Sequence, residues 1–282
     1  GNIGKGHDYN LYWPADLVCD FLSFMQPMLD KAGLGDIKVT NGEPTNWYRF
    51  SFWGYADAIA ENPDALTNLG IITSHGFYVG GYDNRWYGSH TPKGIETLRS
   101  LRPGLHAWVT STSWSRMDSR FIKEIWGNIY EAGVNGIIPW AGIQRPPLWI
   151  GGDPNPGCAI RVSEDGKYEI MPGYYYYKQV SRAGQPGMKV AWTMSMDSEL
   201  PVIAFASDRT GNSDSFVVVN TSLKSEKMIE ITIKGTASDR FRLYRTSGNG
   251  ENYSDIGETE VNDGKILYRA PANSATTFFA VN

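Results

Sequence analysis

Three side chains of this 282-residue chain could act on a bound substrate, and each follows or ends a short apolar run. They are Glu43, His75 and Ser111. A carboxylate or an imidazole can transfer a proton, whereas a serine becomes a nucleophile only where a base removes its proton. The chemistry that these side chains can support depends on the strands and helices that position them.

Other kinds of site find little support. Cys19 and Cys158 lie too far apart in the sequence to form a disulfide framework or a metal knuckle. We find no phosphate-binding glycine loop and no serine–histidine–aspartate order. The net charge is −4 and both signs are mixed along the chain, which gives no electrostatic case for binding nucleic acid. No apolar run is long enough to span a membrane. We therefore expect no cofactor, no metal, no nucleic acid and no membrane partner.

Aromatic residues make up 13% of the chain, including 10 Trp and 16 Tyr. Most of them would fill a core. Flat rings with a polar edge also suit the faces of pyranose sugars, so the composition favours a carbohydrate partner.

The first ~185 residues alternate helical and strand patterns. Apolar residues recur every three or four positions from Pro14 to Ala32, which predicts a helix with a kink or a break at Pro27. Further helices are predicted near 55–61, over 93–101 and 118–132, and from Pro172 onward. Strands are predicted over 37–40, 70–75, 106–111 and 134–140. Helices that alternate with strands indicate parallel strands, so this segment is either an open α/β sheet or half of a (β/α)8 barrel.

The pattern changes around Pro186, where the apolar residues begin to alternate with period two. Turn sequences such as Asn262-Asp263-Gly264 separate the apolar runs. This predicts an antiparallel β-sandwich of about 95 residues. The predicted strands include residues 216–219, 229–233, 241–244, 266–268 and 276–279.

Five strings, taken in their order, resemble the C-terminal portion of glycoside hydrolase family 30, a clan A family that includes glucosylceramidases and xylanases. They are LGIITSHGFYVGG (69–81), IIPWAGI (137–143), MPGYYYYKQVSRAGQPGMKV (171–190), FRLYRTSGNGENYSDIG (241–257) and PANSATTFFAV (271–281). The resemblance implies strands five to eight of a TIM (β/α)8 barrel in residues 1–186, followed by an antiparallel β-sandwich in residues 187–282.

The resemblance also implies a retaining mechanism on β-linked glycans, with two catalytic glutamates. The family's acid/base glutamate, in an Asn-Glu-Pro at the end of strand four, would lie upstream of Gly1. The nucleophile position falls on Ser111, at the end of strand seven. Natural loss of the nucleophile, an engineered substitution and a shifted alignment each explain a serine there, and natural divergence is favoured because residues 112–114 also depart from the family.

Glu43 lies in Asn41-Gly42-Glu43-Pro44, a sequence that copies the acid/base signature. On strand four it would be the proton donor. The preceding helix and the short gap to His75 favour strand five, where Glu43 would line the cleft. A plain surface turn is the third interpretation.

Six residues are candidates for binding substrate, and four of them have an ordinary structural alternative. His75 would bond a sugar hydroxyl or orient the nucleophile position, or be a buried histidine. Trp140 would form the floor of the cleft, or belong to the core. Asn41 would present its amide at the mouth of strand five, as would Asn46, or cap a turn. Tyr78 and Trp114, in loops after strands, would stack on sugars.

The sequence thus predicts a glycoside hydrolase-like protein with negligible turnover as this chain. The alternative is a non-catalytic carbohydrate-binding or scaffold protein derived from a glycosidase. Carbohydrate is the expected partner, and a missing N-terminal half-barrel or a second chain is expected to cover the bare sheet edges. The expected location is extracellular or periplasmic.

Overall fold

The computed structural model describes residues 12–77, 90–114, 116–145 and 157–281. The chain forms two compact units. Unit 1 comprises residues 1–113 and 127–156, and unit 2 comprises residues 114–126 and 157–282. The chain therefore passes between the units three times. The division into family-like segments at 186/187 stays a prediction, because compactness alone does not test it.

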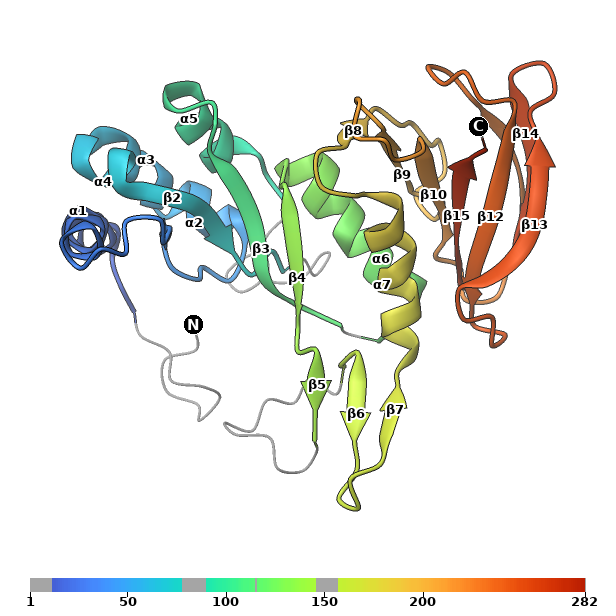
Figure 1. The fold of residues 1–282 in the computed structure, drawn as a ribbon, viewed down its shortest axis with the longest axis horizontal. Helices are drawn as coiled ribbons and strands as arrows, with labels where there is room; N and C mark the ends of the chain where they lie inside the picture. Colours follow the sequence, from blue (N-terminus) through green and yellow to red (C-terminus); the bar gives the residue numbers. More distant parts are fainter. Residues whose placement is uncertain (1–11, 78–89, 115, 146–156, 282) are drawn as a thin grey trace. The chain divides into compact units, whose positions relative to one another are not determined.

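Unit 1 contains a four-stranded parallel sheet in the order β1-β2-β3-β4 (Figure 1). Its strands are β1 (Val39–Thr40), β2 (Leu69–Ser74), β3 (His106–Ser113) and β4 (Gly136–Trp140). Each predicted strand is present, the pairing is parallel throughout, and neighbours in sequence are neighbours in the sheet. This confirms the predicted partial barrel.

Helices connect these strands and bury one face of the sheet. They are α1 (Ala15–Lys31), α2 (Trp47–Phe52), α3 (Tyr55–Glu61), α4 (Pro63–Asn68) and α5 (Lys93–Leu101). The core combines apolar side chains of the helices, such as Leu22 and Leu98, with strand residues such as Ile72 and Val109, all fully buried. Helices α2 and α4 were not predicted, because each is only six residues long and shows no helical periodicity.

Helix α1 runs unbroken through Pro27, so of the predicted kink or break the break is wrong and the kink stays a prediction. Proline has no N–H to donate to the carbonyl four residues earlier, which here belongs to Ser23. Asn68 reaches α1 instead: its Nδ2 lies 3.2 Å from the Leu22 carbonyl oxygen and 3.5 Å from that of Ser23. A side chain from a neighbouring helix therefore reaches the Ser23 carbonyl, the acceptor that Pro27 leaves without its helical donor.

Strand β3 contains a bulge. Val109 is paired with Ile137 and Thr112 with Pro139, so three steps along β3 match two steps along β4. Ala107, Val109 and Thr112 are buried. The buried positions are therefore odd-numbered before the bulge, whereas the buried position after it is even-numbered. Thr110 and Ser111 consequently both fall between buried positions and lie on the opposite face.

Unit 2 is an antiparallel sandwich, as predicted. A six-stranded sheet has the order β13-β12-β15-β10-β9-β8, and a two-stranded sheet joins β11 and β14. The core between them contains Phe216 and Phe278, which stack at 4.5 Å, and Tyr268, whose ring meets Phe278 edge-on. The strands are β8 (Lys189–Ala191), β9 (Val202–Ala206), β10 (Ser215–Asn220), β11 (Lys227–Thr232), β12 (Arg240–Ser247), β13 (Ser254–Glu260), β14 (Lys265–Ala270) and β15 (Ser274–Ala280).

Helix α7 (Pro172–Ala183) packs on the other face of the six-stranded sheet (Figure 1). Gln179, which is fully buried, ties the two together. Its Nε2 donates to Thr246 Oγ1 at 2.9 Å, and its Oε1 accepts from the Thr277 N–H at 3.1 Å and from the Thr277 hydroxyl. The predicted helix from Pro172 thus belongs to the same compact unit as the sandwich.

The predicted helix over 118–132 is divided into α6 (Ser119–Gly127) and a π-helical turn, η1 (Asn128–Ala132). Three short strands follow β4: β5 (Ile143–Gln144), β6 (Ile160–Val162) and β7 (Tyr168–Ile170), of which β6 and β7 pair as a hairpin. Within the described ranges, no helix combines the length and apolar character that a membrane crossing requires.

Candidate functional site

Glu43 and His75 follow the carboxyl ends of β1 and β2, where they meet Thr110 from the bulge of β3, and we call these three residues the rim cluster. Nε2 of His75 lies 3.0 Å from Oε2 of Glu43. The Thr110 hydroxyl donates to the same carboxylate oxygen. Because neighbouring parallel strands end at the same edge of a sheet, one residue from each strand end can converge there.

Backbone hydrogen bonds hold the two segments of the rim cluster in register beyond the strands. The Pro44 carbonyl accepts from the His75 N–H at 2.9 Å, and the Thr45 carbonyl accepts from the Phe77 N–H at 3.2 Å. The turn that carries Glu43 needs Gly42, whose φ of +85° is accessible mainly to glycine. The segment after β1 therefore follows β2 as if the parallel ladder continued.

Asn41 is buried, and both its amide oxygen and its amide nitrogen form hydrogen bonds with the backbone of β2. Its Oδ1 accepts from the Thr73 N–H at 2.7 Å, and its Nδ2 donates to the Thr73 carbonyl at 3.0 Å. These bonds position the turn that bears Glu43. A direct bond from Asn41 to a sugar stays a prediction, and it would have to compete with this pair. Asn46 caps α2, where its Oδ1 accepts from the Arg49 N–H at 2.8 Å.

Burial raises the pKa of Glu43, but hydrogen bonds from His75 and Thr110, together with the charge of His75, outweigh it and leave the pKa below its ordinary value. Glu43 is therefore a carboxylate at neutral pH. A general acid must hold its proton near the working pH, which usually requires a raised pKa. An ionised Glu43 can accept hydrogen bonds from sugar hydroxyls, but it has no proton to donate to a leaving group.

A buried polar network supports the loop that carries His75. Nε1 of Trp47 donates to Asn128 Oδ1 at 2.8 Å, and Nδ2 of Asn128 donates to the Gly76 carbonyl at 3.1 Å. A Cβ at Gly76 would lie 2.5 Å from Asn128 Oδ1, so the loop fits closely against the network. The ring of Phe77 meets the imidazole of His75 edge-on at 5.2 Å. His75 is thus fixed by its own loop as well as by Glu43.

Ser111 and Trp140 lie at the same edge of the sheet as the rim cluster. Ser111 is half-buried in the bulge of β3, beside Thr110. Trp140 ends β4, is 44% exposed, and is in register with Ser113. The exposure of Trp140 agrees with a residue at the mouth of a cleft rather than in a core.

The ring of Trp114 is buried and is not accessible to a ligand. It is 3% exposed and packs against Phe121 and Tyr177 of unit 2, with ring centroids 5.3 and 5.6 Å apart. The expectation of sugar stacking by Trp114 fails because neighbouring aromatic rings enclose it. Tyr78 lies outside the described residues.

Thr110 is the site residue that sequence reasoning missed. The resemblance directs attention to Ser111, the next residue, and a threonine inside a strand carries no motif. The alternation of buried Ala107 and Val109 would have placed Thr110 on the face away from the helices, where the rim cluster forms.

Four parallel strands connected by helices, with an antiparallel sandwich in the same chain, define a partial (β/α)8 barrel with a β-sandwich. No protein-family model matches the sequence, and no curated protein does so either. Solved structures similar to this one include glycoside hydrolases.

A family 30 endoxylanase from Clostridium papyrosolvens is 18% identical, with a TM-score of 0.71 over 99% of this chain and 63% of its own. The catalytic domain of a family 30 xylanase C from Talaromyces cellulolyticus is 20% identical, with a TM-score of 0.73 over 98% of this chain and 59% of its own. A family 44 endoglucanase from Clostridium acetobutylicum is 12% identical, with a TM-score of 0.65 over 95% of this chain and 61% of its own.

The chain therefore spans about three fifths of the length of these enzymes. At this level of identity the likeness shows the fold. The predicted resemblance to the C-terminal portion of family 30 is confirmed at that level.

Proposed function

We propose that this chain is part of a glycoside hydrolase-like protein whose intact form acts on β-linked glycans, and that it binds glycan at the carboxyl ends of its parallel strands. The rim cluster carries this proposal, because a carboxylate, an imidazole and a hydroxyl converge where barrel enzymes of this fold build their sites. The exposed ring of Trp140 would give a sugar an apolar surface.

Cleavage with retention needs two carboxyl groups about 5–5.5 Å apart. Glu43 is the one carboxylate of the rim cluster, and it is ionised at neutral pH. Ser111 stands at the nucleophile position without a carboxylate to attack the anomeric carbon. We therefore expect this chain alone to bind glycan without cleaving it.

The binding experiment uses isothermal titration of the chain with neutral xylo- and gluco-oligosaccharides. Glu43→Gln and His75→Ala should each weaken binding at least tenfold, because each removes a polar partner at the rim. Glu260→Gln, which removes an exposed carboxylate of β13, serves as the control and should change nothing. Equal affinity of the rim variants and the parent chain would exclude this site.

The turnover experiment offers the chain aryl β-xylosides and aryl β-glucosides. We expect no release of the aryl group above the uncatalysed rate. Hydrolysis that Glu43→Gln abolishes would contradict the expected inactivity and would make Glu43 catalytic.

A non-catalytic binding or scaffold protein is the second candidate, and Ser111 favours it. The coding sequence upstream of Gly1 separates the two candidates. An Asn-Glu-Pro within a few dozen residues supports an enzyme as the parent, and its absence supports the binding protein.

Among the described residues, β1 and β4 each have a strand neighbour on one side only. Bare strand edges promote association, so we propose that a further half-barrel or a second chain covers them. Sedimentation of the chain should show self-association. A stable monomer would contradict a second copy as the cover. We also propose that the protein works outside the cytoplasm, where polymeric glycans are found, and cell fractionation tests this.

A further inference from the structure

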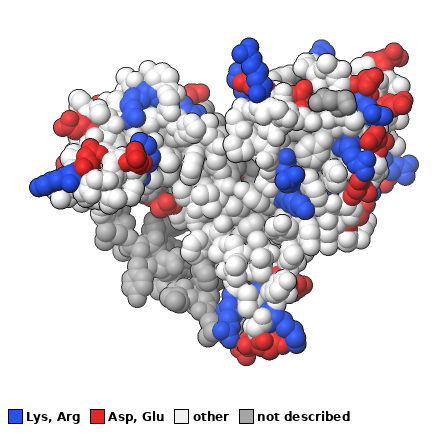
Figure 2. All heavy atoms as spheres, in the orientation of Figure 1, with Lys and Arg blue, Asp and Glu red and all other residues white. Residues whose placement is uncertain are grey.

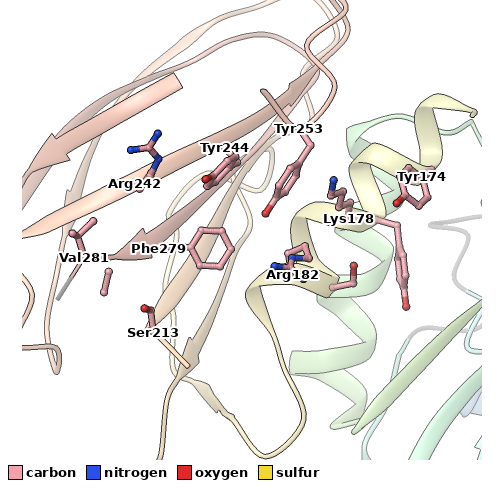
Figure 3. Close-up of a pocket in the computed structure, with 12 residues that line it drawn as sticks. Tyr174, Lys178, Arg182, Ser213, Arg242, Tyr244, Tyr253, Phe279 and Val281 are labelled. Carbon is pink, nitrogen blue, oxygen red and sulfur yellow. The ribbon is translucent and has the colours of Figure 1, made fainter. Parts of the chain in front are cut away.

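Unit 2 contains a groove that is separate from the rim cluster. Its volume is about 810 Å³, and it lies between helix α7 and the face of the six-stranded sheet on which α7 packs (Figure 3). Lys178 and Arg182 come from α7, whereas Tyr244 and Phe279 come from β12 and β15. Tyr253, just before β13, lies between the helix and the strands (Figure 3).

The aromatic side of the groove is held in a fixed arrangement. Tyr244 and Tyr253 stack with ring centroids 4.9 Å apart and ring planes 11° from parallel. Phe279 meets Tyr244 edge-on at 5.9 Å. A fixed set of rings presents its edges and hydroxyls to a ligand without the entropic cost of ordering flexible side chains.

Among the residues that the structure describes, no carboxylate pairs with the cations on the α7 side of the groove. Nζ of Lys178 lies 4.4 Å from the centroid of the Tyr253 ring, and Arg182 lines the groove beside Tyr253 (Figure 3). In the described ranges, neither cation is ion-paired with an Asp or a Glu. Arg242, at the other end of the groove, differs because it pairs with Asp255 and Glu258.

Several other cations of unit 2 do have carboxylate partners. The drawn face shows Lys and Arg interspersed with Asp and Glu (Figure 2). Elsewhere in unit 2, cations such as Lys227, Arg245 and Lys265 have carboxylate partners at 2.5–2.8 Å. Lys178 and Arg182 are one turn apart on α7 and line the same groove, so a single anionic group could receive hydrogen bonds from both.

We propose that this groove binds an anionic saccharide, with a carboxylate or sulfate of one sugar held between Lys178 and Arg182. The hydroxyls of Tyr244, Tyr253 and Ser213 would bond sugar hydroxyls, and Phe279 would supply an apolar surface. An open, hydroxyl-rich groove fits a polyhydroxylated chain better than a compact apolar ligand. The choice of a saccharide rests on the proposed association with glycans, while the charge requirement rests on the groove alone.

Isothermal titration of the complete chain tests the proposal with tetragalacturonate, a glucuronate-bearing xylo-oligosaccharide and a sulfated oligosaccharide. Tetragalacturonate with methyl-esterified carboxyls is the matched ligand control, because it keeps the sugars and removes the charge. We expect at least one anionic probe to bind, the esterified form to bind at least tenfold more weakly, and raised salt to weaken the binding. Binding of a uronate probe alone or of the sulfated probe alone identifies which anion the groove takes.

Lys178→Gln/Arg182→Gln should weaken binding of the anionic probe at least tenfold. Lys167→Gln/Lys189→Gln removes the same charge from exposed positions of unit 2 and should leave the affinity unchanged. A circular dichroism melt of each variant shows whether it folds like the parent chain. Failure of all three anionic probes to bind, or equal loss of affinity in both double variants, would overturn the proposal.

Glu43→Gln separates this inference from the proposed function. It should weaken binding of neutral glycans at the rim and leave the anionic probe bound in the groove. If neutral glycans do not bind at all while the anionic probe does, the rim proposal fails and the groove proposal stands.

Discussion

Glu43 shows how two donors determine the charge state of a partly buried carboxyl. Burial alone would raise its pKa, yet the hydrogen bonds from His75 and Thr110 and the charge of His75 place the pKa below the ordinary value of 4.5. A carboxyl with a depressed pKa in the folded state stabilises the fold above its unfolded pKa, and this contribution is lost as pH falls through the folded pKa. The stabilising effect of the rim cluster should therefore disappear on the acid side of 4.5.

His75→Ala should raise the pKa of Glu43, because it removes the donor and its charge while most of the burial remains. A ¹³C NMR titration of the Glu43 side-chain carboxyl measures the change. Thr110→Ser keeps a hydroxyl and serves as the control, with a smaller effect expected. An unchanged pKa in His75→Ala would show that the contact between His75 and Glu43 does not persist in solution.

At this scale the sequence indicated the important positions more reliably than their roles. Glu43 and His75 were selected because they follow strands, and the structure joins them. Trp114 follows a strand in the same way but is buried, because its exposure depends on rings more distant in sequence. Local spacing cannot report such contacts.

The elements that carry the site are connected by buried polar side chains rather than by apolar packing alone. Asn128 bonds both the Trp47 indole and the Gly76 carbonyl, and it lies at the start of the π-helical turn. Gln179 does the same between α7 and the six-stranded sheet. Each connection joins segments at least 52 residues apart, which is why hydrophobic periodicity did not predict it.

Asn128→Ala should lower the free energy of unfolding of unit 1 by about 2 kcal/mol, because it leaves the Trp47 N–H and the Gly76 carbonyl buried without these partners. Urea denaturation followed by tryptophan fluorescence measures the loss. Asn249→Ala, at an exposed turn, should change stability by less than about 0.5 kcal/mol. Equal stability of both variants would mean that the network contributes nothing measurable.

Gln179→Leu should destabilise unit 2 by about 2–3 kcal/mol, since it keeps the volume but leaves the Thr277 N–H without its Gln179 acceptor and removes one of the hydrogen bonds of Thr246 Oγ1. Ser181→Ala on the same helix is the control and should stay within about 0.5 kcal/mol of the parent chain. Thermal melting by circular dichroism tests both. A stable Gln179→Leu variant would show that apolar packing alone holds α7 on the sheet.

At the scale of the whole molecule, fold class followed from sequence because two periodicities, helical and alternating, occupy separate stretches of the chain. All four parallel strands were predicted, as were five strands of the sandwich. The compact units were not predicted, since residues 114–126 and α7 belong with the sandwich although they lie within the barrel-like sequence. Periodicity shows that a helix has an apolar face and does not show which sheet covers it.

A fragment comprising residues 157–282 should accordingly fold better than one comprising residues 187–282. The shorter fragment lacks α7, so it exposes the sheet face that Gln179 and Tyr176 cover. We expect a cooperative thermal transition at a higher temperature for the longer fragment, and poorer amide dispersion in NMR spectra of the shorter one. Identical melting temperatures would contradict the assignment of α7 to unit 2.

The extra residue in β3 has a consequence for how such proteins diverge. Three residue steps of β3 match two steps of β4 at the bulge. This extra residue determines which face of the sheet each later side chain of β3 occupies. Deleting one residue there would exchange inner and outer positions up to the end of the strand, without replacing any amino acid. Insertions and deletions at this point could therefore change which functional group a homologue presents to a ligand, and a comparison limited to aligned substitutions would miss that change.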